Sequence, residues 1–246
     1  HLQSFPTRRS SDLYPPATRR QRFLRGVRLG TPIFLGYIPV GMAFGVLART
    51  MGFTVWQATL CSATALAGAG QFIGLSLVGS GSGVVPALTA TAVVNLRYVL
   101  FATTMSPHLK GVRRPTLAWL AYTLTDETFA INIADRRQGL STPASMAGVG
   151  AISWTGWVLG TLAGAAGAAW IGDPTRWGVD FAMPAMFAAL FVALAEDRKH
   201  VLIGLLAAGL VLALPLLAAL GIVIQTSWLI VIASVGAATA ASVIYR

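Results

Sequence analysis

Long apolar runs follow one another along almost the whole chain and constrain its fold more than any other feature. A helix that crosses a bilayer needs about 20 consecutive apolar residues, because each residue advances it by about 1.5 Å. The chain is 55% hydrophobic and 11% charged, with a mean hydropathy of +0.70, which is typical of polytopic membrane proteins. The sequence therefore predicts an all-α, polytopic membrane bundle. It contains up to eight apolar segments, at residues 29–48, 56–78, 84–105, 116–134, 146–170, 179–195, 201–220 and 222–244.

The connections between these segments are short, so we predict a single membrane transport domain over residues 29–246, preceded by a basic extension at 1–28. This extension holds seven arginines against one aspartate, a net charge of +6 out of +10 for the chain. Basic residues beside the first apolar segment favour a cytoplasmic N-terminus next to anionic lipid headgroups, and not a nucleic-acid surface. Residues 1–13 carry no pattern that the membrane domain needs, and an origin outside the natural gene is one interpretation of them.

Several kinds of chemistry are excluded by the composition. One cysteine and three scattered histidines leave no internal disulfide and no His/Cys metal cluster. The stretch "GSGSG" (79–83) satisfies G-x-S-x-G, but no histidine is placed to act as its base. The stretch "GAGQFIG" (68–74) lacks the acid that a dinucleotide site needs about 20 residues later. We therefore predict a protein that is not an enzyme and that carries no cofactor or metal.

Helix-breaking residues interrupt several of the apolar segments. Broken helices are tolerated in a membrane where the freed backbone groups face protein or a wet cavity, and they often mark transport sites. Packing through small residues is the alternative explanation for each of them. The basic loop at 110–114 and the N-terminus both look cytoplasmic although three apolar segments separate them, so we predict that the second segment is re-entrant. The breakers are Pro32, Gly36, Pro39, Gly41, Gly45, Gly68, Gly70, Gly74, Pro184 and Pro215.

Three ionisable side chains lie inside the apolar segments, where a charge must be paired, hydrated or neutral. Arg97 lies eight residues before the end of the third segment, and Asp126 and Glu127 lie ten and eleven residues into the fourth. If these two segments are adjacent and antiparallel, as their short connection favours, Arg97 and one acid reach nearly the same depth and pair. Consecutive helical residues point about 100° apart, so the other acid is left to bind an amino group or to carry a proton.

Polar groups near these charges extend the candidate site. The predicted substrate-binding or proton-coupling side chains are Gln71, Asn95, Arg97, Asp126 and Glu127, and the predicted backbone contacts are Gly68 and Gly70. The alternative is structural: Arg97 and one acid form a clasp, and the amides form interhelical hydrogen bonds. The seven tryptophans are interpreted mostly as an aromatic belt at the ends of the segments.

Five stretches together resemble the AzlC family of branched-chain amino-acid permeases. They are "GTPIFLGYIPVGMAFGVLARTMGF", "LAGAGQF", "NLRYVLFATTMSP", "TDETFA" and "DFAMPAMFAAL". The resemblance runs from about Gly30 to the C-terminus. It implies a multi-pass inner-membrane exporter of branched-chain amino acids such as valine, working with a small AzlD-like membrane subunit. It supplies no role for any single residue.

The residues and the resemblance together predict a bacterial inner-membrane permease with a cytoplasmic N-terminus. We expect outward transport driven by the proton gradient, with Asp126 or Glu127 as the proton-sensitive group. One alternative is a membrane scaffold or subunit that transports nothing, in which the charges are purely structural. The other is an intramembrane enzyme, for which the sequence offers neither a nucleophile with a base nor a metal set.

Overall fold

The computed structural model describes residues 18–79, 81, 83–171 and 198–213, together with isolated positions between 176 and 192 and between 236 and 241. Apart from such positions, the predicted segments at 179–195 and 222–244 lie outside the described residues, as do residues 1–17, Pro184 and Pro215. Every regular element in the described part is helical, which confirms the predicted fold class. The chain divides into two compact units, residues 1–183 and 184–246.

The described helices are short except for two. The second unit contains α10 (Arg198–Ala213), which corresponds to the seventh predicted segment. In chain order, the first unit contains α1 (Arg19–Thr50), α2 (Val55–Thr64), α3 (Ala69–Gly79), α4 (Val84–Asn95), α5 (Arg97–Met105), the 3-10 turn η2 (Ser106–His108), α6 (Arg114–Tyr122), α7 (Asp126–Arg137) and α8 (Pro143–Ile171).

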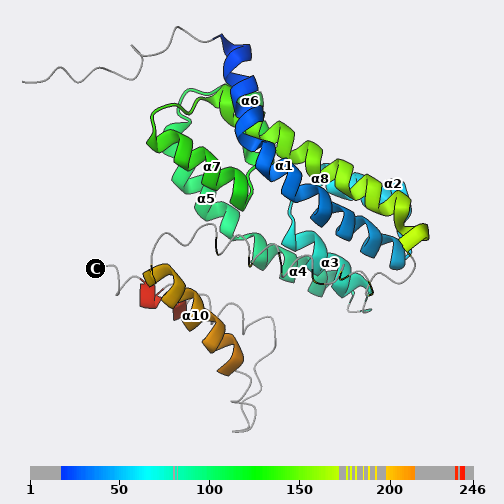
Figure 1. Cartoon of the computed structure of the whole chain (residues 1–246). Helices are drawn as coiled ribbons and strands as arrows, with labels where there is room; N and C mark the ends of the chain where they lie inside the picture. The colour runs from blue at the N-terminus through cyan, green and yellow to red at the C-terminus, as the bar shows by residue number, and fades with distance from the viewer. Residues whose placement is uncertain are drawn as a thin grey trace, which may run out of the picture. The chain divides into compact units, whose positions relative to one another are not determined.

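The long helices α1 and α8 pack side by side and form the centre of the first unit (Figure 1). Gly26 faces Ser145 near one end and Gly45 faces Ala165 near the other, so the two helices run parallel. Glycines bring the backbones into contact: a Cβ added to Gly41 would lie 2.7 Å from a backbone oxygen of α8. Small residues commonly allow such close approach between membrane helices.

Helix α1 is continuous through Pro32 and Pro39. These prolines therefore do not break the first segment. Of its predicted glycine breakers, Gly41 and Gly45 pack against α8, whereas Gly36 has no neighbour within 4 Å of an added Cβ. The helix begins at Arg19, within the predicted basic extension, and Thr18 starts it with a capping box that includes Gln21.

The second predicted segment forms the α2–α3 hairpin. Gly68 lies in the turn between the two helices with φ of 47°, a conformation that glycine adopts readily. Helix α2 begins just after α1 ends, and Gly79 at the end of α3 lies beside Met51, again at the end of α1. The hairpin enters and leaves at the same end of α1, as predicted for a re-entrant segment.

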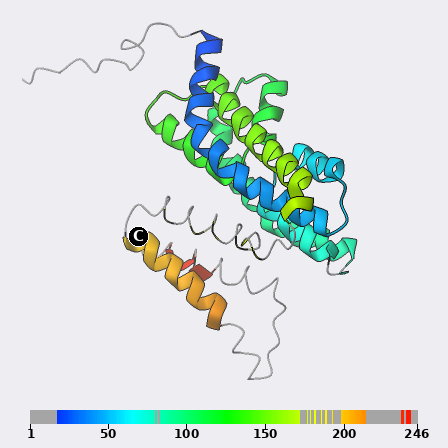
Figure 2. The same cartoon turned by 45° about the vertical axis from the view of Figure 1, so that its right-hand side comes forward.

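The fourth predicted segment also divides, which the sequence analysis did not predict. Helix α6 lies alongside α8, and the Trp119 indole of α6 donates a hydrogen bond to the carbonyl of Ala147 in α8 at 3.3 Å. After a turn at residues 123–125, α7 returns along α1 and ends where Asp135 pairs with Arg25. This α6–α7 hairpin therefore enters from the end opposite to α2–α3 (Figure 2).

Helices α4 and α5 together form the third predicted segment and bend at Leu96. Three stretches of the described chain are long and apolar enough to cross a membrane: α1, residues Val84–His108, and α8 from Pro143 to Trp170. Residues Val84–His108 leave most of their apolar surface exposed. Helix α4 runs antiparallel to α3, because Thr91 lies opposite Gly74 and Asn95 lies opposite Gly70.

The two basic stretches lie at the same end of the first unit. Lys110, in the loop before α6, lines one cavity together with Met146 near the start of α8. Ser145 in turn faces Gly26 near the start of α1. The re-entrant α2–α3 hairpin thus removes the conflict between the basic loop and the basic N-terminus.

Candidate functional site

All three divided segments break at the same level, near the middle of α1 and α8. The carbonyl of Ala63, near the end of α2, accepts hydrogen bonds from the Tyr122 hydroxyl at the end of α6 and from the Trp154 indole of α8. The two hairpins therefore meet tip to tip. Because each hairpin comes from a different end, their tips close the centre of the unit from both sides.

The bend between α4 and α5 joins this meeting point through Asn95. The Asn95 carboxamide lies so close to Gly70 that a Cβ there would be 2.9 Å from its nitrogen. The Thr91 hydroxyl donates to the Gly70 carbonyl at 3.3 Å. The Asn95 Oδ1 atom is buried and has no hydrogen-bond partner within the described part of the chain.

Six short-helix ends consequently surround one region. Helices α3, α5 and α7 begin there, and α2, α4 and α6 end there. A helix start carries partial positive charge and a helix end carries partial negative charge, because its last peptide groups are unpaired. Such half-helix ends bind the charged groups of substrates in many transporters.

Arg97 and Asp126 form an ion pair at this level, as the sequence analysis predicted. Arg97 Nη1 lies 2.9 Å from Asp126 Oδ2, and the two side chains are 24% and 20% exposed. Each is the first residue of its helix, α5 and α7. The Arg97 guanidinium also lies 5.3 Å from the centre of the Tyr98 ring. The pair is therefore accessible to a small ligand while most of its surface is covered.

The predicted antiparallel arrangement behind this pair is wrong. Four residues after Arg97, Phe101 stacks on Phe129 with ring centres 4.5 Å apart, and further along Ile133 packs against the buried cluster that contains Met105. The contacts advance together along α5 and α7, so these helices run parallel. The turn at 123–125 reverses the chain just before Asp126, which brings α7 alongside α5 in the same direction.

The second acid, Glu127, binds a tyrosine that the sequence analysis missed. The Tyr37 hydroxyl of α1 donates to Glu127 Oε2 at 2.6 Å and lies 2.8 Å from Thr125 Oγ1. Tyr37 is 6% exposed. A buried tyrosine hydroxyl usually needs a polar partner, so its place in the apolar "GYIPVG" stretch was the available signal.

Gln71 is fully engaged in holding the α2–α3 hairpin against α8. Its Oε1 accepts from the Trp157 indole at 2.9 Å, and its Nε2 donates to Ser62 Oγ at 3.2 Å. Trp157 is 1% exposed, so it is a core residue and the aromatic-belt interpretation is wrong for it. Its ring contacts the Tyr37 ring edge-on at 5.3 Å, which links Gln71 to the Glu127 side of the site.

The carbonyls of the two glycines predicted as backbone contacts take part in hydrogen bonds within the protein. The Gly68 carbonyl accepts from the backbone N–H of Gln71 at 3.0 Å, and the Gly70 carbonyl accepts from the Thr91 hydroxyl. The structure therefore brings the five predicted side chains to one level through separate contacts. Arg97 meets Asp126, Asn95 meets Gly70, Glu127 meets Tyr37, and Gln71 meets Trp157.

Replacing Tyr37 with phenylalanine should weaken the contact between α1 and α7. The change leaves Glu127 without its tyrosine donor, and we expect a loss of about 1–3 kcal/mol in the free energy of unfolding. A double-mutant cycle with Glu127→Gln, followed by unfolding of the purified protein, measures the coupling. We expect about 0.5–3 kcal/mol for residues in direct contact. Additive effects would show that the hydroxyl and the carboxylate do not interact.

The fold and site define an all-α membrane protein in which broken helices meet at the middle of the bundle. The AzlC protein family model matches residues 32–171, which is more than half of the chain and contains the whole site. This chain belongs to the AzlC family.

Curated relatives agree with this assignment. The chain is 30% identical over 220 residues to the inner membrane protein YgaZ of Escherichia coli K12, covering 85% of this chain and 89% of YgaZ. It is 27% identical over 171 residues to the branched-chain amino acid transport protein AzlC of Bacillus subtilis 168, covering 69% and 66% of the two chains. An uncharacterized membrane protein of Helicobacter pylori J99 is 31% identical over 161 residues, covering 65% of this chain and 70% of the relative. No solved structure matches the chain.

Proposed function

We propose that this protein exports branched-chain amino acids, valine among them, across the bacterial inner membrane in response to the proton gradient. The observation that carries the proposal is the meeting of six half-helix ends around Arg97, Asp126 and Glu127. The substrate class is supported by the printed name of the Bacillus subtilis relative. Membership of a transport family favours transport over catalysis.

The proposed binding mode uses the charges of a free amino acid. The starts of α3, α5 and α7, together with Arg97, provide positive potential for the carboxylate. The ends of α2, α4 and α6 and the acids at the start of α7 provide negative potential for the ammonium group. Asn95 Oδ1, buried without a partner in the described part, is a further acceptor for that group.

Glu127 is the proposed proton-coupling residue. Its carboxylate is held by Tyr37 and does not take part in the ion pair of Arg97 with Asp126. A proton that arrives at Glu127 would weaken its acceptance of the Tyr37 hydrogen bond. That contact joins α1 to the tip of the α6–α7 hairpin, so protonation there would favour movement of the hairpin.

The proposal includes a cytoplasmic N-terminus and a small AzlD-like membrane subunit. Orientation is supported by the positive-inside rule, because the arginine-rich start of α1 and the loop with Lys110, Arg113 and Arg114 lie at one end. The exposed apolar surface of Val84–His108 offers room for lipid or a partner helix. Labelling of a cysteine placed at Lys110 from one side of intact cells tests the orientation.

Transport assays in proteoliposomes test the function directly. We expect the reconstituted protein to exchange radiolabelled leucine and valine, and we expect an imposed pH gradient to drive net flux. Glu127→Gln should abolish the response to the gradient while exchange continues, because the proton site is lost while Arg97 and Asp126 keep their charges. Gradient-independent flux by the unchanged protein would contradict proton coupling, and absence of any exchange would contradict transport.

A non-transporting scaffold is the second candidate, and one observation favours it. Gln71, Arg97 and Asp126 all have protein partners, as expected for residues that only hold helices together. A scaffold predicts that Asp126→Asn and Glu127→Gln alter stability without any flux to lose. The exchange assay therefore separates the two candidates.

A further inference from the structure

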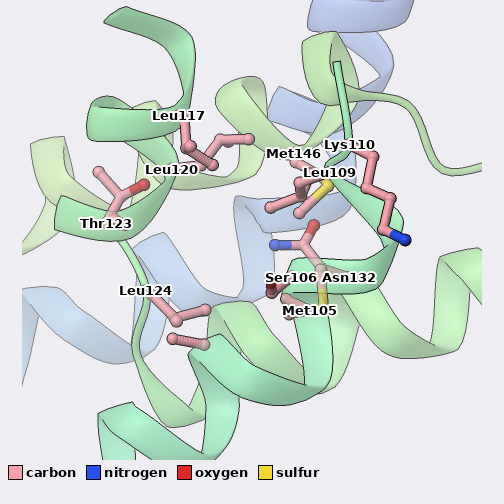
Figure 3. A pocket seen from close by; sticks show the side chains of 12 residues that line it. Met105, Ser106, Leu109, Lys110, Leu117, Leu120, Thr123, Leu124, Asn132 and Met146 are labelled. Atoms are coloured by element: carbon pink, nitrogen blue, oxygen red, sulfur yellow. The ribbon is translucent and has the colours of Figure 1, made fainter. Parts of the chain in front are cut away.

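A cavity of about 330 Å³ lies between η2, α5, α6, α7 and the start of α8 (Figure 3). This volume is at the small end of the range for small-molecule sites in proteins, about 300–1,000 Å³. Half of the lining residues are leucines and methionines, which suit the apolar side chain of a small ligand. The apolar side chains are Met105, Leu109, Leu117, Leu120, Leu124 and Met146.

Asn132 gives this apolar cavity a polar interior. Its side chain lies among Ser106, Leu109 and Met146 (Figure 3), and the residue is only 6% exposed. Its carboxamide is not among the fully buried polar groups that lack a hydrogen-bond partner in the described part of the chain, and the residue lines the cavity. A bound polar group can therefore exchange hydrogen bonds with this carboxamide in place of water.

Lys110 gives the cavity one positive charge. It is exposed, and it is the charged member of the described lining. Arg113 and Arg114 follow in the same loop, so this end of the unit attracts anions. A lysine ammonium is a compact charge that pairs well with a free carboxylate.

The opposite part of the cavity lies close in the chain to the central site. Thr123 and Leu124 line it, and they belong to the turn that precedes Asp126. The Thr123 hydroxyl donates its hydrogen bond to the Trp119 carbonyl at 2.9 Å, so it forms part of the cavity wall and does not offer this donor to a ligand. Ala102 on α5 lies on the helix that begins with Arg97.

We propose that this cavity is a vestibule that binds a branched-chain amino acid before the amino acid reaches Arg97 and Asp126. The aliphatic side chain packs among the leucines and methionines, the Asn132 carboxamide bonds to the polar end, and Lys110 attracts the carboxylate. This inference rests on the proposed transport function. It adds a second binding site for the substrate, on the side of the unit where α1 begins.

Site-resolved cysteine labelling tests the vestibule. Ala121→Cys places a thiol in the cavity lining, and Ala118→Cys places one on the exposed surface of the same helix, outside the cavity. The full chain is reconstituted in vesicles, treated with a maleimide and examined by peptide mass spectrometry, with Cys61 as an internal reference. At ten times the Kd for L-leucine, we expect labelling at position 121 to slow about tenfold and labelling at 118 to stay unchanged.

A second variant separates binding in the vestibule from folding. Asn132→Leu replaces the amide with an apolar side chain of similar volume in an apolar lining, so we expect the protein to unfold at about the same temperature. We also expect the KM for leucine to rise about tenfold with little change in kcat and the protection at position 121 to disappear. An Asn132 with only a structural role would leave KM and protection unchanged.

The remaining outcomes overturn the proposal in distinguishable ways. Leucine exchange by the unchanged protein without protection at position 121 would remove the vestibule and keep the proposed function. Protection by oleate but not by leucine would identify the cavity as a lipid site. Failure of the unchanged protein to exchange or bind leucine would overturn the transport function and the vestibule together.

Discussion

Replacing Gly164 with alanine is expected to destabilise the protein severely, although only one methyl group is added. Its Cβ would lie 2.6 Å from both the Cα and the carbonyl carbon of Met42, in the backbone of α1. Backbone atoms inside a helix cannot move aside as a side chain can. Helices α1 and α8 must therefore separate, and we expect a loss of about 3 kcal/mol or more in the free energy of unfolding.

The matched control for this change is Gly167→Ala, three residues further along α8. A Cβ on Gly167 meets nothing within 4 Å, and the same is true of Gly36 on α1. Alanine stabilises a helix by up to about 1 kcal/mol relative to glycine, so these controls should leave stability unchanged or raise it. Titration of the purified protein with a denaturing detergent measures the change in the free energy of unfolding for each variant, whether it is a loss or a gain. Equal effects at positions 164 and 167 would contradict close packing of α1 on α8.

Breaking the Arg97–Asp126 pair is expected to abolish transport. Arg97→Met leaves Asp126 without its partner in a mostly covered site, and loss of one member of a buried pair costs up to about 3–5 kcal/mol. Flux measured in proteoliposomes should fall to background. Arg49→Met is the matched control, because Arg49 is exposed on α1 and its removal changes the net charge equally.

The double variant Arg97→Met with Asp126→Asn decides between a binding role and a structural clasp. Both charges are gone, so we expect unfolding stability to recover relative to the single variants. Transport should stay absent if the charges contact substrate. A double variant that folds and transports normally would show that the pair only joins α5 to α7.

The local sequence contained most of what defines the class of protein. The length of an apolar run and the cost of a charge inside it are local properties, so they predicted the helical membrane fold, the long helices α1 and α8, and the importance of Arg97 with one acid. The glycines in the second apolar segment and the conflict between the two basic stretches predicted that this segment is re-entrant, and the structure adds that Gly68 forms its turn with a positive φ. These inferences needed no knowledge of which segments are neighbours.

Only the tertiary structure decided where helices break and what the buried polar groups touch. Pro32 and Pro39 leave α1 intact, whereas α6 ends at Tyr122 and α7 begins at Asp126 with no glycine or proline between them. Whether a helix continues or ends at such a position depends on its packing against segments far away in the chain. The pairing of Glu127 with Tyr37, 90 residues apart, and the parallel course of α5 and α7 depend on the same long-range packing. Local sequence sets the cost of a buried polar group, and the packing of distant helices supplies its partner.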